Sequence, residues 1–165
     1  MADRSLRIYS WNVNGIRAAA DKGLGAWLEG CGGEIVGVQE VRAEPHQIPE
    51  PIAKLDQYQQ HWSPAERKGY SGVAIYAKRP PRIVAGFGCP EFDAEGRYLE
   101  AHFAELTVVS VYLPSGSSGP HRQASKFRFL EEFLPHLAKL RKRKREIVLC
   151  GDWNIAHKEI DLKNW

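Results

Sequence analysis

Six short apolar segments, rich in Val, Ile, Leu and aromatic residues, are the feature that most limits how this chain can fold. Each has five to seven residues, a length typical of a β-strand rather than of a helix. None approaches the roughly 18–20 consecutive apolar residues that cross a bilayer. The segments predicted as strands are residues 6–12, 34–40, 72–78, 98–104, 107–112 and 146–150, and the fourth and fifth are expected to form a hairpin or to be adjacent strands.

Two longer stretches carry apolar residues at the spacing of a helix. The first, residues 16–29, includes glycines and is expected to end at the glycine pair that follows Cys31. The second, residues 125–143, contains Pro135, which predicts a kink or a shorter helix. Strands and helices mixed within 165 residues indicate one α/β or α+β domain.

The composition is that of a folded globular protein, since 43% of the residues are hydrophobic and 26% are charged. The three cysteines, Cys31, Cys89 and Cys150, lie far apart, which excludes a disulfide scaffold and a paired zinc-binding spacing. This use of cysteine is typical of a reducing cytoplasm, and residues 1–12 lack the apolar stretch of a secretory signal. We therefore expect a cytoplasmic protein with no membrane partner.

The positive charge is concentrated in one place. The formal net charge is +3, and residues 139–145 alone supply six positive charges, so the rest of the chain is slightly acidic. This run has two interpretations: a patch that binds phosphate groups, or the solvated C-terminus of a helix, where cations complement the helix dipole. The second is favoured, because the run lies at the opposite end of its helix from the loop after Tyr112.

Polar side chains that strand packing does not need follow four of the predicted strands. They are Asn12 and Asn14, Glu40, Tyr112, and Asp152 with Asn154. Functional side chains gather at strand ends, because the sheet fixes the backbone while the loops leave the side chains facing solvent. Carboxylate and carboxamide oxygens that converge there suit a hard cation such as Mg²⁺ rather than zinc.

Each of these residues also has a purely structural interpretation. The asparagines could serve only as turn residues, the glutamate could pair with Arg42, and the tyrosine could pack in the core. The Asp-x-Asn pair could form an Asx-turn. The coincidence of such residues at four separate strand ends favours a functional site.

A series of short sequence blocks resembles, in order and spacing, the exonuclease III family of apurinic/apyrimidinic endonucleases. The blocks are residues 10–18, 38–40, 69–74, 96–98, 111–114 and 149–156 followed by 159–162. They cover essentially the whole chain, and the last one, within GDWNIAHKEIDLKNW, is highly specific. The resemblance implies the endonuclease/exonuclease/phosphatase fold, a four-layered α/β sandwich of two sheets with helices outside.

The resemblance also implies a role for each strand-end residue. Glu40 is the principal metal carboxylate with Asn12 beside it, and Asp152 orients and deprotonates the attacking water. Asn154 donates a hydrogen bond to the charge on the phosphorus, and Tyr112 contacts the scissile phosphate. The implied metal ligands are Asn12, Glu40, Asp152 and Asn154, with Mg²⁺ as the cofactor and Mn²⁺ as an alternative. Phosphodiester hydrolysis needs these parts: a cation, a base for water and fixed hydrogen-bond donors.

The implied function is a DNA-repair nuclease of base excision repair, acting as a monomer on double-stranded DNA. It would incise 5′ to abasic sites and remove nucleotides or blocking groups from 3′ ends. Two other hypotheses are a nucleic-acid-binding relative without activity and a small-molecule or lipid phosphodiesterase of the same superfamily. The intact Glu40, Asp152 and Asn154 argue against the first, and the NGIRA, YLP and EIDLKN elements argue against the second.

Members of the resembled family continue past the residue that matches Trp165, with aromatic residues around the abasic sugar and a terminal Ser-Asp-His element. Residues 1–165 are therefore expected to be the N-terminal portion of a single domain. Absent strands should leave apolar positions such as Val36, Val38, Val109 and Val148 partly exposed. The isolated chain is then expected to be marginally stable and inactive.

Overall fold

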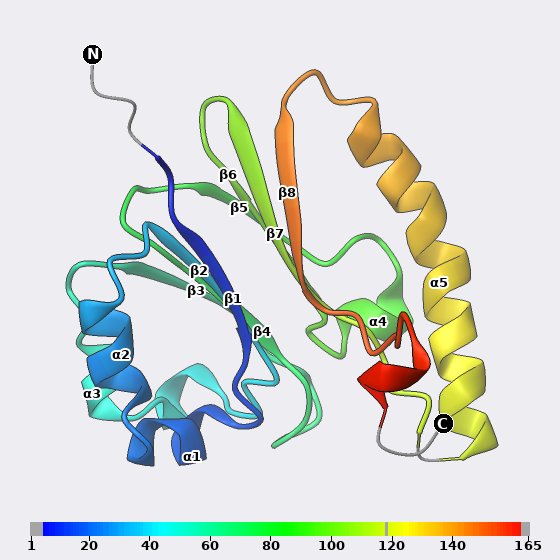
Figure 1. The fold of residues 1–165 in the computed structure, drawn as a ribbon, viewed down its shortest axis with the longest axis horizontal. Helices are drawn as coiled ribbons and strands as arrows, with labels where there is room; N and C mark the ends of the chain where they lie inside the picture. Colours follow the sequence, from blue (N-terminus) through cyan, green and yellow to red (C-terminus); the bar gives the residue numbers. More distant parts are fainter. Residues whose placement is uncertain (1–4, 118, 163–165) are drawn as a thin grey trace.

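Two four-stranded sheets pack face to face in the computed structural model, which describes residues 5–117 and 119–162 (Figure 1). The first sheet has the order β1, β2, β4, β3, with bounds Ile8–Asn12, Ile35–Gln39, Val73–Ala77 and Gln59–Ser63. The second has the order β5, β6, β7, β8, with bounds Arg82–Ala85, Tyr98–His102, Leu106–Tyr112 and Glu146–Asp152. β1 is parallel to β2 and β7 to β8, while β6 and β7 form the predicted antiparallel hairpin.

Helices cover the outer face of each sheet, which confirms the predicted four-layered arrangement (Figure 1). On the first sheet these are α1 (Ile16–Asp21), α2 (Leu24–Gly30) and α3 (Glu50–Ala53), and on the second they are α4 (Pro90–Asp93) and α5 (Pro120–Arg141). Two short 3₁₀ turns, η1 and η2, cover Pro45–Gln47 and Glu159–Asp161. Among the described residues, no helix is both long enough and apolar enough to cross a bilayer.

The central strands are buried on both faces. Ile35 of β2 and Ile75 of β4 face the second sheet, where they pack with Leu99 and Val108. The next residue along β2, Val36, belongs to the cluster that packs under α1, α2 and α3. Successive side chains of a strand point to opposite faces, so a strand covered on both sides is a continuous apolar run.

The prediction that four valines would be partly exposed is wrong for three of them. Val36, Val38 and Val109 are fully buried, because they lie on β2 and β7, which have a neighbouring strand on each side and a layer on each face. Val148 is 36% exposed, as expected. It lies on β8, which within the described residues pairs only with β7.

The two predicted helices differ from the observed ones at their ends. The helix expected over residues 16–29 is divided into α1 and α2, because Gly23 adopts a left-handed φ of 93°. The helix expected over residues 125–143 begins earlier, at Pro120, and runs without interruption through Pro135 to Arg141. The shorter helix predicted from Pro135 is therefore wrong.

Arginines of the basic run 139–145 hold parts of the fold together. Arg143 donates a hydrogen bond of 2.6 Å to Glu100, and Arg145 donates to the carbonyls of Phe103 and Ala104. The run leads into β8, whose far end carries Asp152, roughly 20 Å away at the usual rise per strand residue. These positions agree with the interpretation of the run as a helix terminus.

A buried charged cluster lies between β6 and α5. Glu100, 1% exposed, accepts hydrogen bonds from the Tyr98 hydroxyl at 2.7 Å and from Arg143. Two imidazoles face its carboxylate, with Nε2 of His102 at 2.8 Å and Nε2 of His136 at 3.5 Å. Burial alone would raise the pKa of Glu100, but these donors and cations outweigh it and hold that pKa below its ordinary value.

This cluster is expected to make the protein less stable in mild acid. Burial lowers the pKa of both His102 and His136, so the folded chain resists protonation there. The unfolded chain takes up those protons near its ordinary histidine pKa of 6.5, so the free energy of unfolding falls as the pH drops from about 7 to about 5. Thermal melts over this range measure the effect. The double variant His102→Gln/His136→Gln should show a smaller decline, and a decline equal to that of the wild type would contradict the assignment.

Candidate active site

Side chains from both sheets meet where β1, β2, β7 and β8 end. Asn12, the last residue of β1, donates through Nδ2 to Glu40 Oε1 at 2.8 Å and to Asp152 Oδ2 at 2.6 Å. Its own Oδ1 accepts the backbone N–H of Asn14 at 2.9 Å. One amide thus joins a carboxylate that follows the first sheet to a carboxylate at the end of the second, and its N–H groups offset the repulsion between the two negative charges.

The Glu40 carboxylate is buried but surrounded by donors. Its backbone is left-handed, with a φ of 54°, and its side chain accepts hydrogen bonds from Asn12 and from the Arg42 guanidinium, with the Tyr112 phenol near enough to affect its pKa. Burial alone would raise the pKa of Glu40, but the three donors together hold that pKa below its ordinary value. The group is therefore an anion at neutral pH and can serve as a ligand for a hard cation.

Tyr112, the last residue of β7, provides a neutral phenol in the same set. Tyr112 is only 9% exposed. Burial is the main cause, and the interaction with Glu40 the second, that raises the pKa of its phenol well above the ordinary value. A phenol with a raised pKa keeps its proton at neutral pH, so Tyr112 acts here as a hydrogen-bond donor.

Asp152 and Asn154 form an Asx-turn at the end of β8. The backbone N–H of Asn154, at a left-handed φ of 47°, bonds Asp152 Oδ1 at 2.9 Å. The Asn154 side chain donates to the carbonyl of Leu113 at 2.9 Å, and the backbone carbonyl of Asn154 accepts from Lys126 at 2.6 Å. The structural interpretation of this pair is therefore correct, and it does not exclude a role in catalysis, because the turn holds the Asp152 carboxylate toward Asn12.

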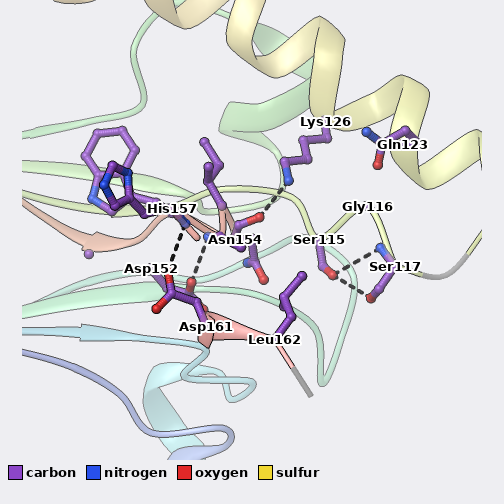
Figure 2. A pocket seen from close by; sticks show the side chains of 14 residues that line it. Ser115, Gly116, Ser117, Gln123, Lys126, Asp152, Asn154, His157, Asp161 and Leu162 are labelled. Carbon is purple, nitrogen blue, oxygen red and sulfur yellow. Dashed lines mark hydrogen bonds between the residues drawn. The ribbon is translucent and has the colours of Figure 1, made fainter. Parts of the chain in front are cut away.

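A pocket of about 780 Å³ opens beside this turn (Figure 2). Figure 2 shows Ser115 and Ser117 of the loop after β7 beside Asn154, and Lys126 of α5 reaching the same turn. Its lining includes hydroxyl, ammonium, carboxamide and carboxylate groups, from Ser115, Ser117, Lys126, Asn154 and Asp152, among apolar side chains such as Trp153 and Leu162. A phosphate ester could enter it next to the carboxylates.

The donor set of this site fits a hard divalent cation. Glu40 and Asp152 supply anionic oxygens, and Asn154 supplies a carboxamide from the adjacent turn. Asn12 presents its Nδ2 to the two carboxylates, so its side chain would have to turn over to offer its oxygen to a cation. In the described part of the chain, no three His, Cys, Asp or Glu side chains are grouped so as to bind a metal ion. Two carboxylates with carboxamide and water oxygens are typical of Mg²⁺, which keeps several of its waters in proteins.

The sequence prediction missed two residues that lie directly behind the site. Arg97 is buried against Tyr112, and Tyr70 contacts Arg97 in turn. Both lie in sequence blocks that resemble the exonuclease III family, residues 96–98 and 69–74. This resemblance was the only feature of the sequence that could have identified them. A buried arginine is unusual enough to require partners, but its burial is not visible in the sequence.

Comparison with known proteins identifies the family. Residues 9–165 match the model of the endonuclease/exonuclease/phosphatase family. The chain belongs to that family. It is 35% identical to an exodeoxyribonuclease of Bacillus subtilis, over 96% of this chain and 62% of the relative, and 37% identical to the DNA repair nuclease APEX1 of Danio rerio, over 97% of this chain and 52% of the relative.

A solved structure agrees with the fold and with the predicted resemblance. An AP endonuclease from Archaeoglobus fulgidus superimposes with a TM-score of 0.82 at 28% identity, covering 97% of this chain and 62% of that one. The resemblance to exonuclease III and AP endonucleases is thus confirmed. The chain spans between about half and two thirds of the length of these three proteins.

Proposed function

We propose that this chain supplies the catalytic carboxylates of a metal-dependent DNA-repair nuclease. It would hydrolyse phosphodiester bonds, incising 5′ to abasic sites and removing nucleotides or blocking groups from 3′ ends of double-stranded DNA. The observation that carries the proposal is the Asn12 amide, which holds Glu40 and Asp152 together from the two sheets beside a protonated Tyr112 phenol. The relatives that are exodeoxyribonucleases and DNA-repair nucleases support DNA as the substrate class.

Each residue would perform one part of the hydrolysis. Glu40 and Asp152, with the carboxamides of Asn12 and Asn154, would hold the cation, and Mg²⁺ is the ion that best suits these oxygens. A bound cation supplies positive charge that offsets the charge building on the phosphate and the leaving oxygen. Asp152 would accept a proton from the attacking water, because its carboxylate is held by Asn12 and by the Asn154 N–H in a fixed orientation.

Hydrogen-bond donors would stabilise the phosphate as negative charge accumulates on it. The Tyr112 phenol keeps its single proton and would turn it from Glu40 to a phosphate oxygen when Glu40 binds the cation. The Asn154 amide has two N–H groups, of which one bonds Leu113, so the other remains for the substrate. Donors fixed in advance by the protein do not have to reorganise when the charge develops.

Two assays on the complete protein test the proposed function. An abasic-site duplex should be cut in the presence of Mg²⁺ and left intact when EDTA is added, while inositol phosphates are left intact in parallel. Hydrolysis of the inositol phosphates alone would favour the small-molecule phosphodiesterase. Metal-independent binding of the duplex without any cleavage would favour the relative that lacks activity. The monomeric state and the cytoplasmic location stay predictions.

Replacing Glu40 by Gln should raise the Mg²⁺ concentration that gives half-maximal cleavage, by about tenfold or more. The reason is that one of the few anionic ligands is removed from a cation that binds through charge. A titration of cleavage rate against Mg²⁺ measures the shift. Glu29→Gln, on the exposed side of α2, is the matched control and should leave the titration unchanged. An unchanged titration for Glu40→Gln would remove Glu40 from the metal site.

A further inference from the structure

Arg97 is a charged side chain in the interior, 1% exposed, immediately before β6. The preceding residue, Gly96, has a left-handed φ of 60°, and a Cβ built there would lie 2.2 Å from the carbonyl oxygen of Ser63. Only glycine allows this close approach, which turns the next side chain inward. A guanidinium buried in this way must have its charge and its N–H groups satisfied by neighbours.

Those neighbours include Tyr112, which Arg97 contacts in three ways. The backbone carbonyl of Arg97 accepts the Tyr112 N–H at 2.9 Å, and Arg97 Nη1 donates to the Tyr112 carbonyl at 3.0 Å. The guanidinium carbon also lies 4.8 Å from the centre of the Tyr112 ring. Together these contacts fix the backbone and the ring of Tyr112, whose phenol lies beside Glu40 and helps to lower the pKa of that carboxylate.

The remaining N–H groups of Arg97 connect the site to a loop. Nε is paired with the Glu95 carboxylate, and Nη2 donates to the Tyr70 hydroxyl at 2.8 Å. The Tyr70 loop is tied at its other side to the residues after β2, since the Arg42 N–H bonds the Ser71 carbonyl at 2.8 Å. Arg97 therefore links the Tyr112 strand end with the loop that borders the Glu40 turn.

We propose that Arg97 is a positioning residue, which sets the orientation of the Tyr112 phenol toward Glu40 and toward a bound phosphodiester. The inference rests on the proposed nuclease function. Arg97 is buried and does not itself contact substrate; it acts through Tyr112. A lysine keeps the charge but has no planar fork, so it cannot bond the Tyr112 carbonyl, the Tyr70 hydroxyl and Glu95 at once.

A double-mutant cycle on the complete protein separates positioning from a general structural role. Arg97→Met should lower kcat for an abasic duplex by about tenfold, with KM and the Mg²⁺ titration nearly unchanged, and Arg97→Lys should recover part of the loss. In a Tyr112→Phe background, where the phenol is gone, Arg97→Met should lower kcat by a further factor of less than about three.

The control is Arg143→Met, which removes another arginine that bonds a buried carboxylate. It should lower the melting temperature without changing kcat. If Arg97→Met lowered kcat by the same factor in the wild type and in Tyr112→Phe, the proposal would be overturned.

A second readout does not depend on activity. In protein with ¹³C-labelled tyrosine rings, Arg97→Met should shift the ring resonances of Tyr112 and Tyr70, while those of Tyr9 and Tyr76 in the first sheet stay in place. Unmoved Tyr112 resonances would contradict the inference. If the wild-type protein cuts no DNA, the proposed function fails, and these resonances still decide whether Arg97 positions Tyr112.

Discussion

Asp152→Asn should reduce cleavage of an abasic duplex by about 10²–10⁴-fold, the contribution typical of a positioned general base. The single oxygen of the asparagine can still accept the Asn154 N–H, so the turn is expected to keep its shape, while the bond from Asn12 to the second oxygen is lost. It cannot take a proton from water at neutral pH. Single-turnover cleavage rates measure the loss, and fluorescence anisotropy of labelled duplex in EDTA should show that binding is not weakened.

A matched change elsewhere controls for the loss of one negative charge. Asp56→Asn alters an exposed carboxylate in the turn between α3 and β3, and cleavage by this variant should match the wild type. If Asp152→Asn kept its rate within about tenfold of the wild type, Asp152 would not be the base.

Gly151→Ala should destabilise the fold by about 3–5 kcal/mol, in the range of the most damaging single substitutions. Gly151 has a φ of 149°, and a Cβ there would lie 1.9 Å from the carbonyl oxygen of Val111, its partner on β7. The contact is with backbone inside a parallel pair, so β8 itself would have to move away from β7. Cleavage should fall as well, since Asp152 is the next residue.

Urea unfolding of Gly151→Ala and of Gly30→Ala measures this difference directly. Gly30 ends α2 in an exposed position, and a Cβ there meets no atom within 4 Å. Alanine is a better helix former than glycine, so Gly30→Ala should be neutral or slightly stabilising. Equal midpoints for the two variants would mean that the β7–β8 pair tolerates a side chain at residue 151.

The strand-end residues were predictable because of a general property of sheets. Asn12 and Glu40 follow one parallel pair, and Tyr112 and Asp152 follow another, so the ends of these strands collect the side chains in one place. Their roles in catalysis remain predictions. What the pattern could not indicate is that the Asn12 amide would join the two sheets, because pairing between distant segments leaves no local signal.

Other features depended on tertiary contacts and were missed for that reason. β3, with the sequence QQHWS, lies at the edge of its sheet and has too few apolar residues to resemble a strand. β5 is a four-residue edge strand. The exposure expected for Val36 and Val109 was wrong because it was inferred from absent neighbours, whereas burial depends on strand order, and both lie on inner strands.

The bond between Asn12 and Asp152 joins residues 140 positions apart, and this has a consequence for when the proposed site can assemble. A ribosome adds about 5–20 residues per second, so roughly 7–28 s pass between the synthesis of the two partners. During that interval the nascent chain already carries Asn12 and Glu40 but has no second carboxylate to pair with them. The proposed nuclease site therefore stays incomplete on a chain that is still being made, until β8 has left the ribosome and docked beside β7.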